Sequence, residues 1–215
     1  MSEGDTIRAR VERALGARIA AGVVPAGTLL TVPVLAEEFG VSATPVREAV
    51  LELQRRGFVQ PARNRGFVVT AVDAAHAEHV AAVRELLEPP AMRALADARP
   101  GLDGAREGAA RIAASAAAGD LEAYLEEDRR FHLALTDLTG NPMLTAVVDD
   151  LRARTRLPGL AALVGSEELA ASAAEHDELL DAIEAGDGDA AEAVMRRHIG
   201  HTTGWWAGSP ESAAE

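Results

Sequence analysis

The sequence has 215 residues and contains no cysteine, which excludes disulfide bonds and thiolate metal sites. A chain without cysteine is also compatible with a reducing cytoplasm. No apolar run approaches the roughly 20 residues that a membrane-spanning helix needs. Residues 1–13 are polar and mixed in charge, which is unlike a signal peptide. We therefore expect a soluble, cytoplasmic protein with no membrane partner.

Aromatic residues make up only 3% of the chain, and lysine is absent. The core must therefore be built mainly from alanine, leucine, valine and isoleucine, and the many alanines after residue 74 favour helices. Every positive side chain is an arginine, which suits bidentate contacts with phosphate and guanine. A codon bias across the genome would explain the same arginine usage equally well.

The net charge of −13 is distributed unevenly along the chain. Residues 1–72 contain nine arginines and seven acidic residues, whereas residues 73–215 contain twelve arginines and 27 acidic residues. The overall charge argues against nucleic acid as a partner, but nearly all of the excess acid lies in the second part. The first part is mildly basic, although DNA-binding domains are often more basic than this.

The N-terminal part shows the pattern of three helices separated by glycine turns. Apolar residues recur every four positions over residues 6–21, and a shorter helix is predicted over residues 33–39. Gly40 can take the left-handed conformation that ends this second helix. Thr44 is a suitable N-cap for the third helix, and Pro45 fits its first position.

Two short runs of β-forming residues follow, at 58–60 and 66–70, and the polar segment 61–65 is typical of a hairpin loop. Helix, glycine turn, capped helix and basic hairpin in this order are the pattern of a winged helix-turn-helix. The N-terminal end of the second helix of such a motif enters the major groove, where an arginine reaches base edges. The alternative is an ordinary helical hairpin with a β-ribbon and a solvated arginine face. The predicted DNA-contacting residues are Ser42, Thr44, Arg47, Arg63, Arg65 and Gly66.

Residues 35–50, with the sequence LAEEFGVSATPVREAV, resemble the signature of the GntR family of bacterial regulators. The resemblance continues through residues 57–59 and 65–68, and it implies a winged helix-turn-helix that binds double-stranded DNA. The family usually has an arginine after the serine of this signature, where the chain has Ala43, and that position commonly contacts a base. This departure implies an altered or relaxed operator preference and leaves Arg47 as the main base-reading residue.

From residue 74 onward the pattern is helical throughout. The predicted helices are 74–98, 102–118, 121–139, 142–156, 166–185 and 188–206. Pro89 and Pro90 should kink the first of them. A bundle of about six helices is the simplest packing of these segments. The expected fold class is therefore mainly α, with an N-terminal winged helix-turn-helix (residues 1–72) and a C-terminal all-α helical bundle (residues 73–215).

All six histidines lie in this second part, and three of them share apolar helix faces. Asp128 and His132 are four residues apart, so they face the same way on one helix. His176 and His198 belong to apolar stripes on two other helices. One aspartate and three histidines directed at one interior suit Zn²⁺, Ni²⁺ or Mn²⁺, with open positions for water or an organic acid. Each histidine could instead be a structural core residue, and His201 competes with His198 for the same role.

Segments 128–132, 140–142 and 197–198, together with His176, resemble the FCD effector domain of one large GntR subfamily. Metal-binding members of that subfamily use one aspartate and three histidines at these motif positions. Other members lack the metal and bind large acyl ligands. The intact set favours the metal-binding branch. The ligands that the resemblance implies here are Asp128, His132, His176 and His198.

Residues 83–89 resemble the first helix of the same domain. Arg84 within them is a candidate for binding an effector carboxylate, because a guanidinium can hold a carboxylate with two hydrogen bonds. The alternative is a surface arginine that pairs with Glu88 one turn away.

Together these features predict a dimeric repressor that reads a palindromic operator. A small carboxylate effector would bind the metal and Arg84, and it would shift the spacing of the two DNA-reading heads. One alternative is a metal sensor, in which the metal itself is the signal. Another is a metal-dependent hydrolase, but no general base is evident, since Glu175 points differently from its neighbour His176. We do not expect an enzyme.

Overall fold

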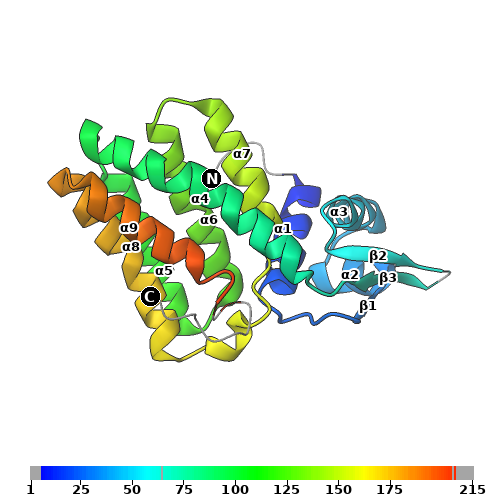
Figure 1. Ribbon diagram of the computed structural model, residues 1–215. Coiled ribbons are helices and arrows are strands. Elements are labelled where there is room, and N and C mark those ends of the chain that lie inside the picture. The colour runs from blue at the N-terminus through cyan, green and yellow to red at the C-terminus, as the bar shows by residue number, and fades with distance from the viewer. Residues whose placement is uncertain (1–5, 64, 205, 207–215) are drawn as a thin grey trace.

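The computed structural model describes residues 6–63, 65–204 and 206, which form a small mixed domain packed on a helical bundle (Figure 1). The small domain has the element order of a winged helix-turn-helix, as predicted. The strand β1, which the sequence pattern did not predict, has only two residues and so shows no periodicity. The elements are α1 (Ile7–Ala20), β1 (Leu29–Leu30), α2 (Val32–Phe39), α3 (Ala43–Arg55), β2 (Val59–Ala62) and β3 (Gly66–Val69).

Helix α3 begins two residues earlier than the sequence indicates. The prediction of Thr44 as the N-cap is wrong, because Ser42 holds that position and Thr44 and Pro45 lie in the first turn. Proline is tolerated there, since the first N–H groups of a helix have no partner within it. The turn before α3 is as predicted, with Gly40 in the left-handed region at φ 63°. The buried residues of α3 are Val46, Ala49, Val50 and Leu53.

Strand β3 is the centre of an antiparallel sheet with the order β1-β3-β2. Gly66 at the start of β3 has φ +122°, and a Cβ atom there would lie 2.2 Å from the carbonyl oxygen of Leu30. The close approach of β1 therefore requires glycine at this position. Strand β2 extends to Ala62, so the hairpin loop is shorter than the predicted segment 61–65, and Asn64 within it lies outside the described residues.

Within the described residues, the bundle contains the six helices that the sequence predicts and one further short helix. Helix α4 runs without a break through Pro89 and Pro90, and the kink expected there stays a prediction. The last helix ends at Gly200, earlier than predicted, and Trp205 in the predicted extension lies outside the described residues. No described helix is long and apolar enough to cross a membrane. The elements are α4 (Ala74–Ala98), α5 (Asp103–Ala118), α6 (Leu121–Leu138), α7 (Pro142–Arg154), η1 (Leu160–Leu163), α8 (Glu167–Ala185) and α9 (Gly188–Gly200).

Two hydrophobic clusters form the core of the protein. The first draws on residues 11–69, and the second draws on residues 81–206 together with Ala21. Most members are aliphatic, as the shortage of aromatic residues requires, and Tyr124 and Phe131 are the largest fully buried side chains. The predicted domain boundary lies between these two clusters and remains a prediction.

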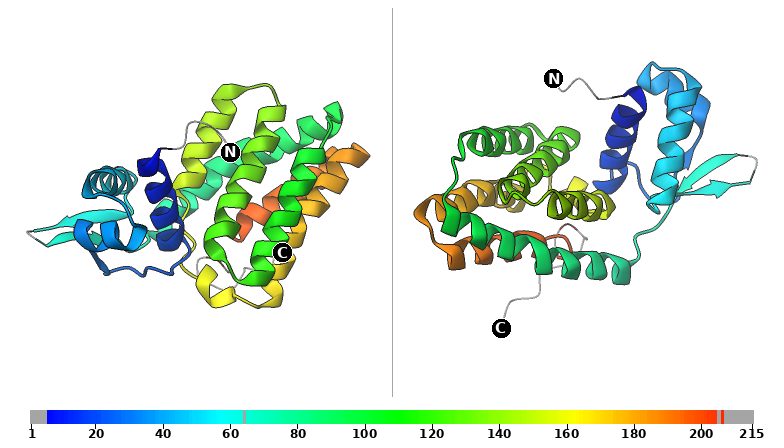
Figure 2. Two further views of the ribbon diagram at one scale, coloured as in Figure 1. Left: turned by 180° about the vertical axis from the view of Figure 1, so that it is seen from behind. Right: turned by 90° about the horizontal axis from the view of Figure 1, so that it is seen from above.

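The two domains are joined by hydrogen bonds as well as by the chain. The backbone N–H of Leu157 donates to the carbonyl oxygen of Ala20 at 2.8 Å. The guanidinium of Arg156 donates to the hydroxyl and the carbonyl oxygen of Thr70 at 2.8 and 2.9 Å, and it lies 5.1 Å from the ring centre of Phe58. Helix α1 therefore packs directly against the bundle, beside α6 (Figure 2).

Candidate functional site

Three helices of the bundle bring one aspartate and three histidines to a single point. Asp128 and His132 lie one turn apart on α6, His176 lies on α8, and His198 lies on α9. The Nε2 atoms of His176, His132 and His198 lie 3.1, 3.5 and 3.5 Å from Oδ1 of Asp128. Ligand atoms around a tetrahedral zinc ion are about 3.3 Å apart when the bonds are about 2.0 Å long. The four side chains therefore fit one shared metal ion.

Hydrogen bonds behind this cluster turn the ring nitrogens inward. Nδ1 of His176 donates to the carbonyl oxygen of Ala173 at 3.0 Å, so its Nε2 carries the lone pair that faces Asp128. Nδ1 of His198 donates in the same way to Oε2 of Glu175 at 3.0 Å. An Nε2 lone pair and a carboxylate oxygen repel each other unless a proton or a metal ion lies between them. The same nitrogen atoms are therefore directed to where a metal ion could bind.

His132 is buried, and neither of its ring nitrogens has a hydrogen-bond partner among the described residues. An unsatisfied buried polar group costs about 1–3 kcal/mol, which coordination of a metal would offset. Burial and the nearby Arg152 guanidinium hold the pKa of His132 well below its ordinary value, so the ring is neutral. Burial opposes ionisation of Asp128, but the three imidazoles outweigh it and keep the pKa of this carboxyl low. Both side chains are therefore in the form that binds metal.

A chain of buried charges leads from the cluster to α4. Arg152 on α7 donates to Oδ2 of Asp128 at 2.9 Å and to Oε2 of Glu88 at 2.6 Å. Glu88 also accepts from Nε of Arg84 at 2.6 Å. Burial opposes ionisation of Glu88, but the two guanidiniums outweigh it and lower its pKa to about 2. Arg84 thus pairs with Glu88 as the alternative interpretation proposed, but it is not a surface residue, because only 3% of its side chain is exposed.

The structure gives Glu175 a role that the sequence did not indicate. Its carboxylate accepts from Nδ1 of His198 at 3.0 Å and from Nε2 of His201 at 2.9 Å. Burial opposes ionisation of Glu175, but the hydrogen bonds from His198 and His201 outweigh it and keep its pKa well below the usual range. His201 therefore contacts Glu175, the residue that orients the ring of His198. His198 itself is one of the four side chains of the cluster.

Glu175→Gln is expected to weaken zinc binding about 10- to 100-fold, because a neutral amide holds the ring of His198 less firmly than a carboxylate does. Competition with a chromogenic chelator measures the dissociation constant. Glu178→Gln is the matched control, since Glu178 lies one turn away on α8, is 55% exposed and pairs with Arg197. Equal zinc affinity in both variants would contradict the supporting role of Glu175.

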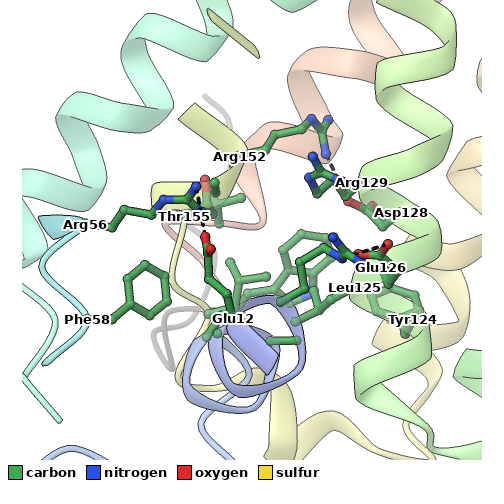
Figure 3. A pocket seen from close by; sticks show the side chains of 18 of the residues that line it. Glu12, Arg56, Phe58, Tyr124, Leu125, Glu126, Asp128, Arg129, Arg152 and Thr155 are labelled. Atoms are coloured by element: carbon green, nitrogen blue, oxygen red, sulfur yellow. Dashed lines mark hydrogen bonds and ion pairs between the residues drawn. The ribbon is translucent and has the colours of Figure 1, made fainter. Parts of the chain in front are cut away.

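A cavity of about 130 Å³ that opens to solvent lies between the cluster and the N-terminal domain (Figure 3). Figure 3 shows Asp128 and Arg152 on one side of this cavity and Arg56 and Phe58 on the other. Arg84 also lines it. A small molecule in the cavity could therefore approach both the cluster and the neighbouring guanidiniums.

Five of the six predicted DNA-contacting residues are exposed on the N-terminal domain, and the sixth, Gly66, is half-buried at the start of β3. Ser42, Thr44 and Arg47 are exposed at the N-terminal end of α3, and Arg63 and Arg65 are exposed at the tip of the β2–β3 hairpin. The hairpin projects away from the bundle (Figures 1 and 2). No described carboxylate forms an ion pair with any of these three arginines. Their guanidinium groups are therefore free to meet phosphates or base edges.

Comparison with protein-family models gives two matches that together cover most of the chain. Residues 7–69 match the model described as bacterial regulatory proteins, gntR family. Residues 79–201 match the FCD domain. The winged helix-turn-helix and the helical bundle thus correspond to two recognised domains.

Curated relatives and solved structures agree with these matches. An uncharacterised HTH-type transcriptional regulator from an unstable DNA locus of Streptomyces ambofaciens is 32% identical over 80% of this chain and 73% of its own length. The galactonate operon transcriptional repressor of Escherichia coli is 28% identical over 90% of this chain and 94% of its own length. The solved structure of Escherichia coli McbR/YncC superposes with a TM-score of 0.73 at 26% identity, covering 91% and 94% of the two chains. The chain therefore belongs to the GntR family of DNA-binding transcriptional regulators, and its helical bundle is an FCD domain.

Proposed function

We propose that this regulator is a dimeric repressor of the bacterial cytoplasm that senses a small organic acid through a bound divalent transition metal, Zn²⁺, Ni²⁺ or Mn²⁺. The metal would be held by Asp128, His132, His176 and His198. The observation that carries the proposal is the convergence of three Nε2 atoms within 3.1–3.5 Å of one carboxylate oxygen. The relative named as the galactonate operon repressor supports the repressor role.

The charges beside the cluster support an anionic effector. The two guanidiniums of Arg84 and Arg152 are balanced by the carboxylates of Glu88 and Asp128. A divalent cation added to this neutral group leaves a local excess of positive charge. A carboxylate that binds the open positions of the metal would offset that excess. Arg84 lines the cavity, and no described residue bonds to its second terminal nitrogen, so this nitrogen can donate to the effector.

The proposed response to the effector is a shift between two arrangements of the dimer. Each α3 and its hairpin would read one half of a palindromic operator, so the distance between the two heads sets the affinity. An effector that binds one arrangement better than the other changes operator affinity by the ratio of its two affinities. The hydrogen bonds between Arg156 and Thr70 provide a contact through which the bundle can position the DNA-binding domain.

The hydrogen bonds of Glu175 argue against the hydrolase alternative. Glu175 is occupied by His198 and His201 and faces the outer nitrogen of His198, so it is poorly placed to activate a water molecule on the metal. The metal-sensor alternative has one specific observation in its favour. Arg152 donates to Asp128 and to Glu88, so a metal ion that binds the Asp128 carboxylate would alter the contact between Arg152 and Glu88.

Selection from a pool of random DNA duplexes with the full-length protein tests the DNA-binding part of this proposal. We expect an inverted repeat to be enriched. A thermal-shift screen of metabolic acids on zinc-loaded protein then tests the sensing part, because a bound ligand stabilises the folded state. An acid that stabilises the protein should change operator affinity with zinc bound and have no effect after chelation. Operator binding that follows zinc alone and ignores every acid would favour the metal sensor.

Arg84→Lys is expected to weaken the response to the stabilising acid about tenfold while leaving the metal content unchanged, because an ammonium cannot hold a carboxylate as a guanidinium does. The acid concentration that half-changes operator affinity measures the response, and elemental analysis measures the metal. Arg93→Lys is the matched control, since Arg93 lies on the same helix and pairs with Glu192 away from the cavity. An unaltered response in Arg84→Lys would remove this residue from the effector site.

A further inference from the structure

The cavity beside the metal cluster has an apolar part whose walls come from the DNA-binding domain. Helix α1 contributes three small residues, Gly16, Ala17 and Ala20, and Leu53 and Phe58 complete this side. Larger side chains at the three α1 positions would occupy this space, because Gly16 already lies close to Leu53, where an added Cβ would be 3.3 Å from Cδ2. The small residues of α1 therefore leave the apolar part open.

The opposite walls come from the FCD domain and continue the same apolar surface. Leu125 of α6, Leu157 and Trp206 line the cavity. Leu125 packs against the hydrophobic clusters of both domains, so it lies at the junction between them. In Figure 3, Leu125 and Phe58 lie away from Arg152, which marks the charged part. The cavity thus has charged groups beside the metal cluster and, where the two domains meet, an apolar surface bordered by the ion pairs Glu12–Arg56 and Arg13–Glu126.

We propose that the effector is a carboxylic acid with an apolar chain, whose carboxylate lies beside Arg84 and Arg152 and whose chain contacts α1 of the DNA-binding domain. This inference rests on the proposed function, since the carboxylate occupies the acid site described above. The chain would lie against Ala17 and Phe58 on one side and Leu125 on the other. Burial of this chain adds affinity in proportion to its apolar area.

The placement of the chain also suggests how binding reaches the DNA. A ligand that touches only the bundle must act through the bundle's own rearrangement. A ligand that contacts α1 depends directly on the position of the DNA-binding domain, so its affinity differs between any two arrangements of the domains. By linkage, the same ligand shifts the balance between those arrangements. The chain of the acid, rather than its carboxylate, would therefore control operator affinity.

The first test is a series of straight-chain carboxylates from two to eight carbons, titrated calorimetrically into zinc-loaded full-length protein. We expect the dissociation constant to fall about fourfold for each added methylene over the first several members, as burial of a CH₂ group predicts. Primary alcohols of the same lengths should bind much more weakly, because they lack the carboxylate. The longer acids should also change operator affinity more than the shorter ones.

The second test uses a larger side chain on α1 of the DNA-binding domain to fill the apolar part of the cavity. Ala17→Leu keeps a good helix former at a half-buried position, and we expect it to weaken octanoate binding at least about tenfold while leaving ethanoate binding and zinc content unchanged. Ala113→Leu is the matched control, because Ala113 is exposed on α5 and remote from the cavity lining. The chain-length series in the unaltered protein stands independently of how well Ala17→Leu folds.

The outcomes separate this inference from the proposed function. If short acids bind and the dissociation constant does not fall as the chain lengthens, the inference is overturned and acid sensing remains intact. Octanoate binding that is equal in Ala17→Leu and Ala113→Leu would also overturn it. If none of the straight-chain acids binds but another acid of the metabolic screen does, the inference fails and acid sensing stands; if no acid of either set binds the zinc-loaded protein, both fail.

Discussion

Asp128→Ala should yield a protein that binds almost no zinc, whereas the unaltered chain should bind one ion. The carboxylate is the point on which the three Nε2 atoms converge, at 3.1–3.5 Å. Its removal takes away both a ligand and the only negative charge among the four side chains of the cluster. Loss of a residue that merely supports a ligand costs about 10- to 100-fold in metal affinity, so loss of the ligand should cost more.

Two measurements check this expectation. Elemental analysis of dialysed protein counts the metal, and thermal unfolding with and without zinc shows whether binding stabilises the fold. Asp128→Asn keeps the shape of the side chain and removes its charge. It therefore controls for the empty space that alanine leaves and for the loss of the partner of Arg152. Asp137→Ala, at an exposed position of the same helix, should bind zinc normally. Full zinc occupancy in Asp128→Ala would show that the metal, if bound at all, lies elsewhere.

Local spacing was sufficient to predict the helices and to direct several histidines inward, but the choice of His198 over His201 came from the resemblance to the FCD domain. Asp128 and His132 lie one turn apart on α6 and share a face, and apolar stripes indicate that His176 and His198 face the interior. The same stripes predict most helix bounds within a few residues. The start of α3 was misplaced, since Thr44 and Ser42 are both good N-caps and only the tertiary structure selects Ser42.

The residues that the sequence did not reveal act through long-range pairing, which leaves no periodic signal. Arg152 lies in the last turn of α7, where a positive charge also suits the helix dipole, so its pairing with Asp128 and Glu88 could not be inferred. Glu175 meets His198 only because α8 and α9 pack together. The cavity depends on how the two domains meet, and the local sequence pattern of either domain does not show that contact.

Arg47→Ala should abolish specific operator binding and leave the fold intact. Arg47 is exposed near the N-terminal end of α3, and no described carboxylate pairs with it, so its side chain contributes little to stability. A good bidentate contact between an arginine and guanine contributes about 1–3 kcal/mol of discrimination between bases. Because this chain has Ala43 where the family signature usually has arginine, Arg47 must supply that discrimination with less help. We expect the affinities for operator and random DNA to become nearly equal.

A gel-shift titration with the selected operator and with a shuffled duplex measures this ratio at one fixed salt concentration, since phosphate contacts vary steeply with salt. Arg55→Ala is the matched control, because Arg55 is 75% exposed at the opposite end of α3 and pairs with Glu52. The control removes the same charge from the same helix, so it should lower both affinities slightly and preserve their ratio. Unchanged operator affinity in Arg47→Ala would show that α3 does not read the bases through this residue. The hairpin arginines, Arg63 and Arg65, would then have to distinguish the bases. In that case their removal should reduce the ratio of operator affinity to shuffled-DNA affinity.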